Sequence, residues 1–145
     1  MMAGGKDMIR RAVEAVDGGS ACCVVVKDGV TVSVSTARGI RPVLDAYDKG
    51  ILSDAFVADK IIGRAAAMIM ALGGVRSCYG ATVSRGALVI FERYGVSVKY
   101  GVLTERIINR SGTGPCPMED AVEGIDDPAR ALLAVRERLA ELLQK

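Results

Sequence analysis

The stretch CCVVVKDGVTVSVS, residues 22–35, decides the fold. Its first half is a continuous apolar run of strand length, which is typical of a strand covered on both faces. Asp28-Gly29 then predicts a tight hairpin turn. In the second half, valines at positions 30, 32 and 34 alternate with Thr and Ser, which indicates a strand with one solvent-facing side near a sheet edge. The stretch therefore predicts an antiparallel pair in the sheet of this protein.

A long helix is expected from about Phe56 to Leu72, because apolar side chains recur there at helical spacing. The segment is apolar almost all round from its middle onward, so we expect it to be the central buried helix. Its charged side chains, Asp59, Lys60 and Arg64, lie in its first half.

The remaining elements alternate between helix and strand, and a helical tail follows them. Leu103–Ile108 fits either a further strand or a short helix. Helices are expected at 7–16, 42–50, about 84–95, 117–124 and from 127 onward, and strands at 75–83 and 96–100.

This order predicts an α/β protein: a three-layer sandwich with a mixed sheet of about five strands. At 145 residues the chain is expected to form a single domain, residues 1–145, with the helical tail from about 117 to 145. The leucine stripe of the last helix packs on the sheet or on another subunit, so a homo-oligomer is possible.

Composition excludes several classes of function. The net charge is +2 and no basic run stands out, so nucleic acid is not expected as the main partner. No apolar run is long enough for a membrane span, and the first residues lack the apolar region of a signal peptide, so a cytoplasmic location is expected. The four cysteines show no repeated spacing, and Cys22 and Cys23 are expected to be small buried residues.

The chain contains no histidine. The commonest general base, the commonest zinc ligand and the Ser-His or Cys-His catalytic pair are therefore absent. Catalysis, if there is any, must use carboxylates, lysines, a thiol or a bound cofactor.

The loop NRSGTGPCPME, residues 109–119, is the best candidate site in the sequence. It leads into a predicted helix start, where unpaired N–H groups attract anions and lower the pKa of a nearby thiol. The alternative is a plain connection to the tail helices. The residues expected to cradle a phosphate or carboxylate are Asn109, Arg110, Ser111, Gly112, Thr113 and Gly114.

Cys116 is either a positioned nucleophile or a small buried residue at a helix start, and no base accompanies it in sequence. Glu119, three residues later, is expected to bond back to the start of its own helix, as in a capping box. Arg38 lies just before the helix at 42–50, where it either completes an anion site or pairs with Asp45.

A second candidate group consists of Asp59, Lys60 and Arg64. At the start of the expected buried helix, a carboxylate and two cations would border a ligand cleft, and Lys60 and Arg64 would share a face. The alternative is a solvated helix end, with Asp59 favourable to the helix dipole.

Two of these strings, VADKIIGRAAA (57–67) and IINRSGTGPCPME (107–119), together with RGIRP (38–42), resemble an uncharacterised prokaryotic family. It is a domain-of-unknown-function family assigned to the cytidine-deaminase-like fold. The resemblance implies a three-layer sandwich with a five-stranded mixed sheet, and it implies no established activity.

Deaminases of this fold carry His/Cys-x-Glu at the start of the buried helix and Pro-Cys-x-x-Cys at the start of the next one, which hold zinc and a proton-shuttling glutamate. Here the first place is occupied by Val57-Ala58-Asp59 and the second by Ser84-Arg85-Gly86-Ala87. Neither place supplies a zinc ligand, whereas catalytic zinc needs three from the protein. We therefore expect a zinc-free domain, without a predicted cofactor.

Taken together, these observations predict a hollow between the start of the buried helix and residues 109–119. It is expected to be electropositive and metal-free, and to bind a small anionic or nucleotide-like ligand. Two alternatives stay open: an enzyme, such as a transferase or hydrolase, that acts through Asp59 or Cys116, and a protein-interaction module with a vestigial cleft.

Overall fold

The computed structural model describes residues 5–109 and 111–144. Six helices and five strands alternate along this part of the chain, as the sequence predicts in outline. In chain order they are α1 (Gly5–Asp17), β1 (Cys23–Lys27), β2 (Val30–Ser35), α2 (Arg41–Asp48), β3 (Phe56–Ile62), α3 (Arg64–Gly73), β4 (Ser77–Ser84), α4 (Arg85–Tyr94), β5 (Ser97–Thr104), α5 (Pro117–Ala121) and α6 (Pro128–Leu143).

The five strands form one mixed sheet in the order β2-β1-β3-β4-β5. β1 pairs antiparallel with both β2 and β3, whereas β3, β4 and β5 are parallel to one another. The hairpin at residues 28–29 is confirmed: Lys27 pairs with Val30, and Asp28 and Gly29 both take positive φ angles, as its turn type requires. An α/β architecture with a mixed five-stranded sheet is thus confirmed.

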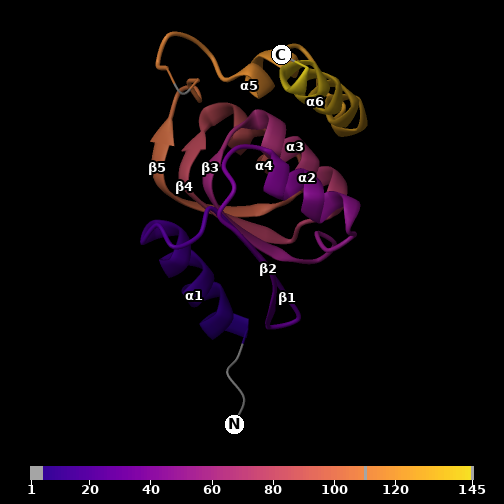
Figure 1. Ribbon diagram of the computed structural model, residues 1–145. Helices are drawn as coiled ribbons and strands as arrows, with labels where there is room; N and C mark the ends of the chain where they lie inside the picture. The colour runs from indigo at the N-terminus through magenta and orange to yellow at the C-terminus, as the bar shows by residue number, and fades with distance from the viewer. Residues whose placement is uncertain (1–4, 110, 145) are drawn as a thin grey trace.

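α1 lies on one face of the sheet and α2, α3 and α4 lie on the other (Figure 1). The buried apolar residues form two separate cores. The larger core lies between the sheet and the layer of α2, α3 and α4, and includes Phe91, Met68 and Ile69. The smaller core lies under α1, which packs Ala12 and Val16 against Val24 and Val26. β1, a central strand, is therefore buried on both faces, which explains the continuous apolar run of residues 22–26.

The expected helix at 56–72 is wrong in its first half. Residues 56–62 form β3, at the centre of the sheet, and the helix begins only at Arg64, after an extended Gly63. Val57, Ile61 and Ile62 fit helical spacing by chance. As a strand, this segment pairs with β1 on one side and with β4 on the other, and these tertiary contacts outweigh the local preference. Asp59 and Lys60 are therefore strand residues, and Lys60 and Arg64 do not share a helix face.

Leu103–Ile108, which fits either a strand or a helix, is mostly neither. β5 continues through Thr104, and Ile108 makes an isolated bridge with Pro115. Residues 105–109 and 111–116 thus belong to no helix or strand between the end of β5 and α5.

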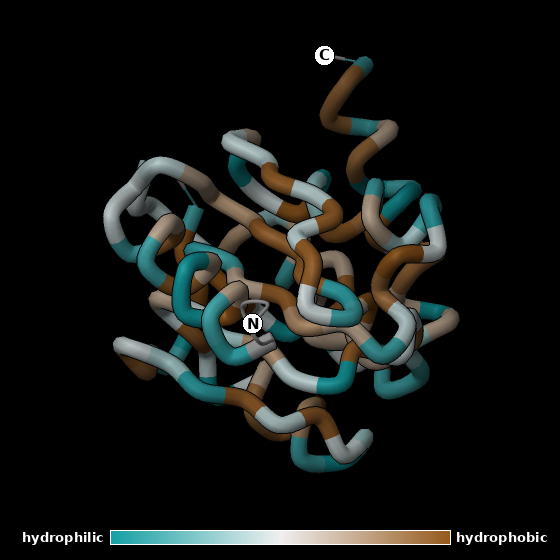
Figure 2. Tube along the Cα trace, turned by 90° about the horizontal axis from the view of Figure 1, so that it is seen from below, coloured by the Kyte–Doolittle hydropathy of each residue, from teal (hydrophilic) through white to brown (hydrophobic). Residues whose placement is uncertain are grey.

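The predicted tail helices are present as α5 and α6, and they pack on the outer side of the helical layer (Figure 1). Ala131 and Val135 of α6 are buried in the larger core, and Arg136 of α6 forms an ion pair of 2.6 Å with Asp48 at the end of α2. The last turns of α6 extend beyond the rest of the chain (Figure 2).

Candidate functional site

The start of α3 holds a carboxylate from a distant part of the chain. Oε1 of Glu119 accepts a hydrogen bond of 2.7 Å from the Arg64 backbone N–H, and Oε2 accepts one of 2.9 Å from the Ala65 N–H. The first N–H groups of a helix have no partner within the helix, and the helix dipole favours a negative charge there. Glu119 therefore caps α3, 55 residues away in sequence, rather than its own helix α5 as expected.

Gly63 makes this contact possible. A Cβ at position 63 would lie 2.6 Å from Cδ of Glu119, which is much closer than a non-bonded contact. Gly63 has φ −98° and ψ −176°, so any residue could adopt its backbone conformation. The glycine is required here by the close approach of the carboxylate and not by backbone geometry.

The Arg64 side chain ties the same region together. Its guanidinium donates to the carbonyl oxygens of Val122 and Ile125, at 3.4 and 2.6 Å, and forms an ion pair of 2.9 Å with Asp126. The predicted ligand-binding arginine is therefore occupied in holding the segment after α5 against α3. Its guanidinium acts as a structural clamp in this conformation.

A cavity of about 240 Å³ lies beside the Glu119 cap, at the carboxyl ends of the parallel strands, where α3 and α4 begin. Ligands of open α/β sheets bind at this end of the strands. The volume is smaller than that of most ligand pockets, so it suits a compact group such as a single base. The lining residues are Arg64, Ser84, Gly86, Glu105, Arg106, Ile107, Pro115, Glu119, Asp120 and Glu123.

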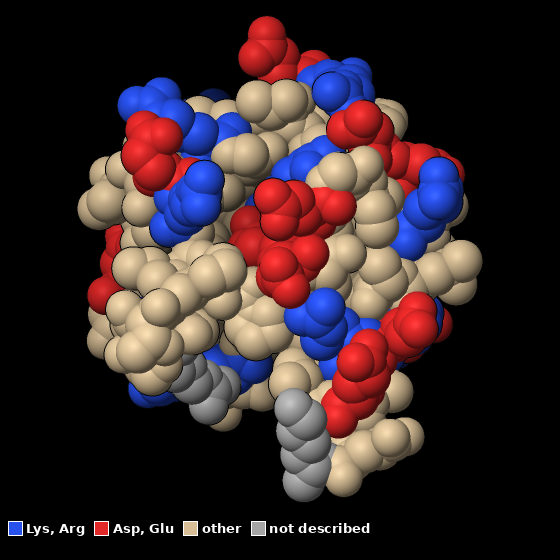
Figure 3. Space-filling model, turned by 90° about the horizontal axis from the view of Figure 1, so that it is seen from above, with Lys and Arg blue, Asp and Glu red and all other residues tan. Residues whose placement is uncertain are grey.

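The cavity is not electropositive as the sequence led us to expect. Among the lining residues, the four carboxylates of Glu105, Glu119, Asp120 and Glu123 outnumber the guanidinium groups of Arg64 and Arg106. On the side of the molecule that carries α5 and α6, acidic side chains gather at the centre of the face with basic side chains around them (Figure 3). Charge alone therefore does not favour a purely anionic ligand.

Several of these charges are already paired. Glu105 pairs with Arg85, and Asp120 forms an ion pair of 3.3 Å with Arg138. Within the described residues, no ion pair involves Arg106 or Glu123. The groups available to a ligand are thus one guanidinium, one carboxylate and the remaining lone pairs of Glu119.

Asp59 does not reach this cavity. It lies in β3 opposite Cys23 of β1 and Gly80 of β4, and is only 5% exposed. Burial raises the pKa of its carboxyl group from 3.8 to about 8, although the backbone N–H groups of Lys60 and Ile61 lower it in part. The same burial raises the pKa of the neighbouring Cys78 thiol to about 12.

Two other predicted cations also stand apart from the cavity lining. Lys60 is exposed on β3, where its backbone N–H donates to Cys22 at 2.9 Å. Arg38 is exposed in the loop before α2, and neither residue lines the cavity. No ion pair between Arg38 and Asp45 is present in the described structure.

The described residues of the predicted anion cradle, Asn109 and residues 111–114, form hydrogen bonds with one another. The N–H of Thr113 donates to Oδ1 of Asn109 at 3.0 Å, and the N–H of Gly112 donates to its carbonyl oxygen at 3.1 Å. Ser111 bonds to both Asn109 and Thr113 through its hydroxyl group. Arg110 lies outside the described residues. These two N–H groups are therefore engaged within the loop, and among the described residues neither Asn109 nor residues 111–114 line the cavity.

Cys116 stands at the start of α5, is half-buried, and packs against the larger core. Its flanking residues Pro115 and Pro117 line cavities, whereas Cys116 itself does not. Cys22 is half-buried rather than buried as expected, while Cys23 is buried.

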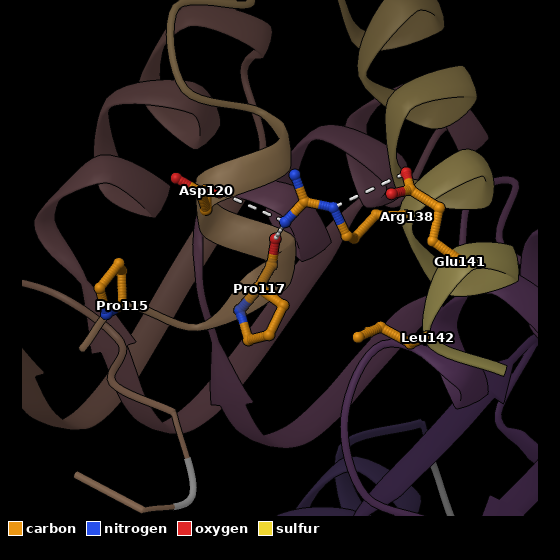
Figure 4. A pocket seen from close by; sticks show the side chains of 6 residues that line it. All are labelled: Pro115, Pro117, Asp120, Arg138, Glu141 and Leu142. Carbon is orange, nitrogen blue, oxygen red and sulfur yellow. Dashed lines mark hydrogen bonds and ion pairs between the residues drawn. The ribbon is translucent and has the colours of Figure 1, made fainter. Parts of the chain in front are cut away.

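A larger cavity, of about 430 Å³, opens between α5 and α6 (Figure 4). Arg138 spans it: its guanidinium donates to the Pro117 carbonyl at 3.1 Å and pairs with Asp120, and it lies 4.0 Å from Glu141. Because these groups satisfy one another, this cavity offers a ligand little beyond the surface of Leu142.

Sequence reasoning missed three residues of the site: Glu119 as a cap of another helix, Gly63 as the residue that admits it, and Arg106. A glycine between an apolar strand and an alanine-rich helix is the one local signal that points to such a close approach. The pairing of residues 63–65 with residue 119 depends on the tertiary fold.

In the described part of the chain, His, Cys, Asp and Glu side chains form no cluster of three that could hold a metal ion. None of the helices there has a stretch both long and apolar enough to span a bilayer.

The fold and site define an α/β domain with a capped helix start beside a small mixed-charge cavity. Residues 11–139 match the family model described as TM1506, a domain of unknown function (DUF1893), so the chain belongs to this family.

The chain is also similar to the crystal structure of a DUF1893 family protein, TM1506, from Thermotoga maritima. The identity is 24%, the match covers 94% of this chain and 90% of that chain, and the TM-score is 0.80, which shows a shared fold. No curated protein matches this chain.

Proposed function

We propose that this protein binds a small nucleotide-like ligand in the 240 Å³ cavity beside the start of α3. The observation that carries the proposal is the Glu119 carboxylate, which two backbone N–H groups hold in place at the cavity wall. A carboxylate has about four lone-pair sites, so two remain for donors on a ligand. The amino groups and ring N–H groups of nucleobases are donors of this kind.

The anionic part of such a ligand meets the guanidinium group of Arg106, which also lines the cavity. A nucleotide carries both a phosphate and donor-bearing base edges, so it fits a mixed-charge cavity better than a simple anion does. We assign no reaction, because Asp59 and Cys116 both lie outside the lining.

The family resemblance supports the same location, since we infer that the fold is cytidine-deaminase-like. In deaminases of this fold, zinc and the base are held at the starts of two neighbouring helices. Because α3 begins at Arg64, the first of these starts is Gly63-Arg64-Ala65 and not Val57-Ala58-Asp59 as expected from the sequence, and the second is Ser84-Arg85-Gly86. Neither start contains a zinc-binding side chain. At the first of these helix starts, the backbone N–H groups hold the carboxylate of Glu119.

A thermal-shift screen of nucleobases, nucleosides and nucleoside monophosphates tests the proposal. A ligand at 100 times its dissociation constant stabilises the folded protein by about 2.7 kcal/mol. We expect at least one nucleotide to raise the melting temperature of the wild type, and the shift to fall in Glu119→Gln and in Arg106→Gln. Glu137→Gln, an exposed change on α6, is the matched control. A panel without any shift, or equal shifts in all variants, would contradict the proposal.

A further inference from the structure

Both oxygens of Glu119 keep an unused acceptor position at the cavity wall. Oε1 accepts from the Arg64 N–H and Oε2 from the Ala65 N–H, and the described residues provide no further donor to either oxygen. A carboxylate oxygen has two lone pairs, so one remains on each. Glu119 therefore presents two acceptors side by side, and no donor, to a ligand in the cavity.

Ser84 supplies a buried donor to the same cavity. The residue is 2% exposed and lines the cavity, and its Oγ accepts the N–H of Ala87 at 3.1 Å. Within the described part of the chain, its hydroxyl group donates to no acceptor. A hydroxyl group has one O–H donor in addition to its lone pairs, and a buried donor without a partner is costly. The Ser84 O–H is therefore available to an acceptor on a ligand.

The Ser84 hydroxyl and the Glu119 carboxylate lie at neighbouring helix starts. A Cβ at Gly86 would lie 3.5 Å from Cβ of Arg64 and 3.8 Å from Oγ of Ser84, so the first residues of α3 and α4 adjoin one another. The backbone N–H of the same Arg64 holds Glu119. A single planar ring between the two helix starts can therefore meet one donor and two acceptors.

We infer that the ligand is a guanine nucleotide, an inference that rests on the proposed function and names its base. The base-pairing edge of guanine carries the acceptor O6 beside two adjacent donors, N1–H and the N2 amino group. The two donors match the two acceptors of Glu119, and O6 matches the Ser84 hydroxyl. Adenine and cytosine carry a ring-nitrogen acceptor beside their amino group, and uracil has one N–H between two carbonyl oxygens. Each of these bases sets a lone pair against the carboxylate.

Charge favours a single phosphate on this nucleotide. The guanidinium of Arg64 is occupied in the clamp on the segment after α5, so Arg106 is the guanidinium that the described lining leaves for a phosphate. Three further carboxylates line the cavity, those of Glu105, Asp120 and Glu123. Each additional phosphate would approach these negative charges. A guanosine monophosphate therefore fits the cavity better than a di- or triphosphate.

Isothermal titration calorimetry of the full chain with four nucleoside monophosphates tests the inference. The nucleotides are GMP, AMP, CMP and inosine monophosphate (IMP), which differs from GMP only by the missing N2 amino group. We expect GMP to bind most tightly. IMP leaves one lone pair of the carboxylate without a donor, so its dissociation constant should be at least about tenfold higher. AMP and CMP should bind more weakly than IMP.

Two variants assign the contacts. Glu119→Gln replaces one acceptor oxygen by an amide donor, so the ratio of the GMP and IMP affinities should fall towards one. Ser84→Ala removes the donor to O6, which GMP and IMP share, so both should weaken by the same factor and the ratio should persist. Glu137→Gln, an exposed change on α6, is the matched control and should alter neither affinity.

The four wild-type titrations decide the inference even where a variant does not fold. AMP, CMP or IMP that binds as tightly as GMP would overturn the assignment of guanine and leave the proposed function standing. Absence of binding by all four nucleotides would overturn both. A GMP preference that persists in folded Glu119→Gln would show that Glu119 does not read the base.

Discussion

Glu119 and Gly63 form a unit at the residue scale. The carboxylate replaces the helix cap that the extended Gly63 cannot supply from a side chain. Of this unit, the sequence alone points only to a carboxylate near a helix start, and it suggests the wrong helix. The capping-box spacing describes contacts within a few residues, whereas the contact that forms spans 55 residues and depends on how α5 packs against α3.

Glu119→Ala is expected to lower the free energy of unfolding by about 1–2 kcal/mol, as loss of a helix cap does. Gly63→Ala should cost a similar amount, because the new Cβ displaces the carboxylate. The double variant should cost little more than Glu119→Ala alone, since the clash is then gone. Urea unfolding measures all three.

Gly86→Ala, at the start of α4, is the control for these substitutions. A Cβ there would meet Cβ and Cδ of Arg64 at 3.5 and 3.7 Å and the hydroxyl oxygen of Ser84 at 3.8 Å, all of them ordinary contacts, so no loss of stability is expected. Strict additivity of Gly63→Ala and Glu119→Ala would show that the two residues do not act together.

The buried carboxyl group of Asp59 is expected to make the free energy of unfolding depend on pH. Its pKa is raised by burial from 3.8 to about 8 in the folded state, so the folded state keeps a proton that the unfolded state loses. The contribution of protonated Asp59 to the free energy of unfolding is present in full below about pH 4. It falls as the pH rises towards 8, by at most roughly 1.4 kcal/mol per pH unit. Asp59→Asn should flatten this dependence and stabilise the protein at neutral pH. Equal pH profiles for the two proteins would contradict the assignment.

At the element scale, β3 shows where sequence patterns fail. A central parallel strand is apolar on both faces, so its pattern does not distinguish it from a buried helix, and here an alanine-rich helix follows after a single glycine. The hairpin and the last helix, α6, are confirmed because each rests on a local signal, and the start of α4 near residue 84 also has one. Ser84 accepts from the N–H of Ala87 at 3.1 Å, as a cap residue should.

Two truncations in α6, one of a buried valine and one of an exposed leucine, test how α6 packs on the helical layer. Val135 is fully buried against the core, whereas Leu133 is 67% exposed. Val135→Ala should lower the free energy of unfolding by about 2 kcal/mol through lost burial and the cavity left behind. Leu133→Ala should change it by less than about 0.5 kcal/mol. Equal costs in thermal or urea unfolding would mean that α6 is not docked as described.

At the scale of the whole molecule, the α/β class and the mixed sheet follow from the alternation of elements and the hairpin. The site follows only in part. Arg64 and the segment that ends at Glu119 do meet, but Asp59 is inside the sheet, and Lys60 and Arg38 lie elsewhere on the surface. Asn109 bonds to Thr113 within its own loop. Which side chains face one cavity depends on strand order and loop paths, and sequence spacing records neither.

The Glu119 carboxylate at the start of α3 is the central feature of the site. Amide hydrogen exchange, measured by NMR, tests it directly, because first-turn N–H groups without a partner exchange rapidly. We predict that the Arg64 and Ala65 amides are protected in the wild type and lose their protection in Glu119→Ala, while the amides of Met68 and Met70 stay protected. Unprotected Arg64 and Ala65 amides in the wild type, or protection that persists without Glu119, would contradict the account.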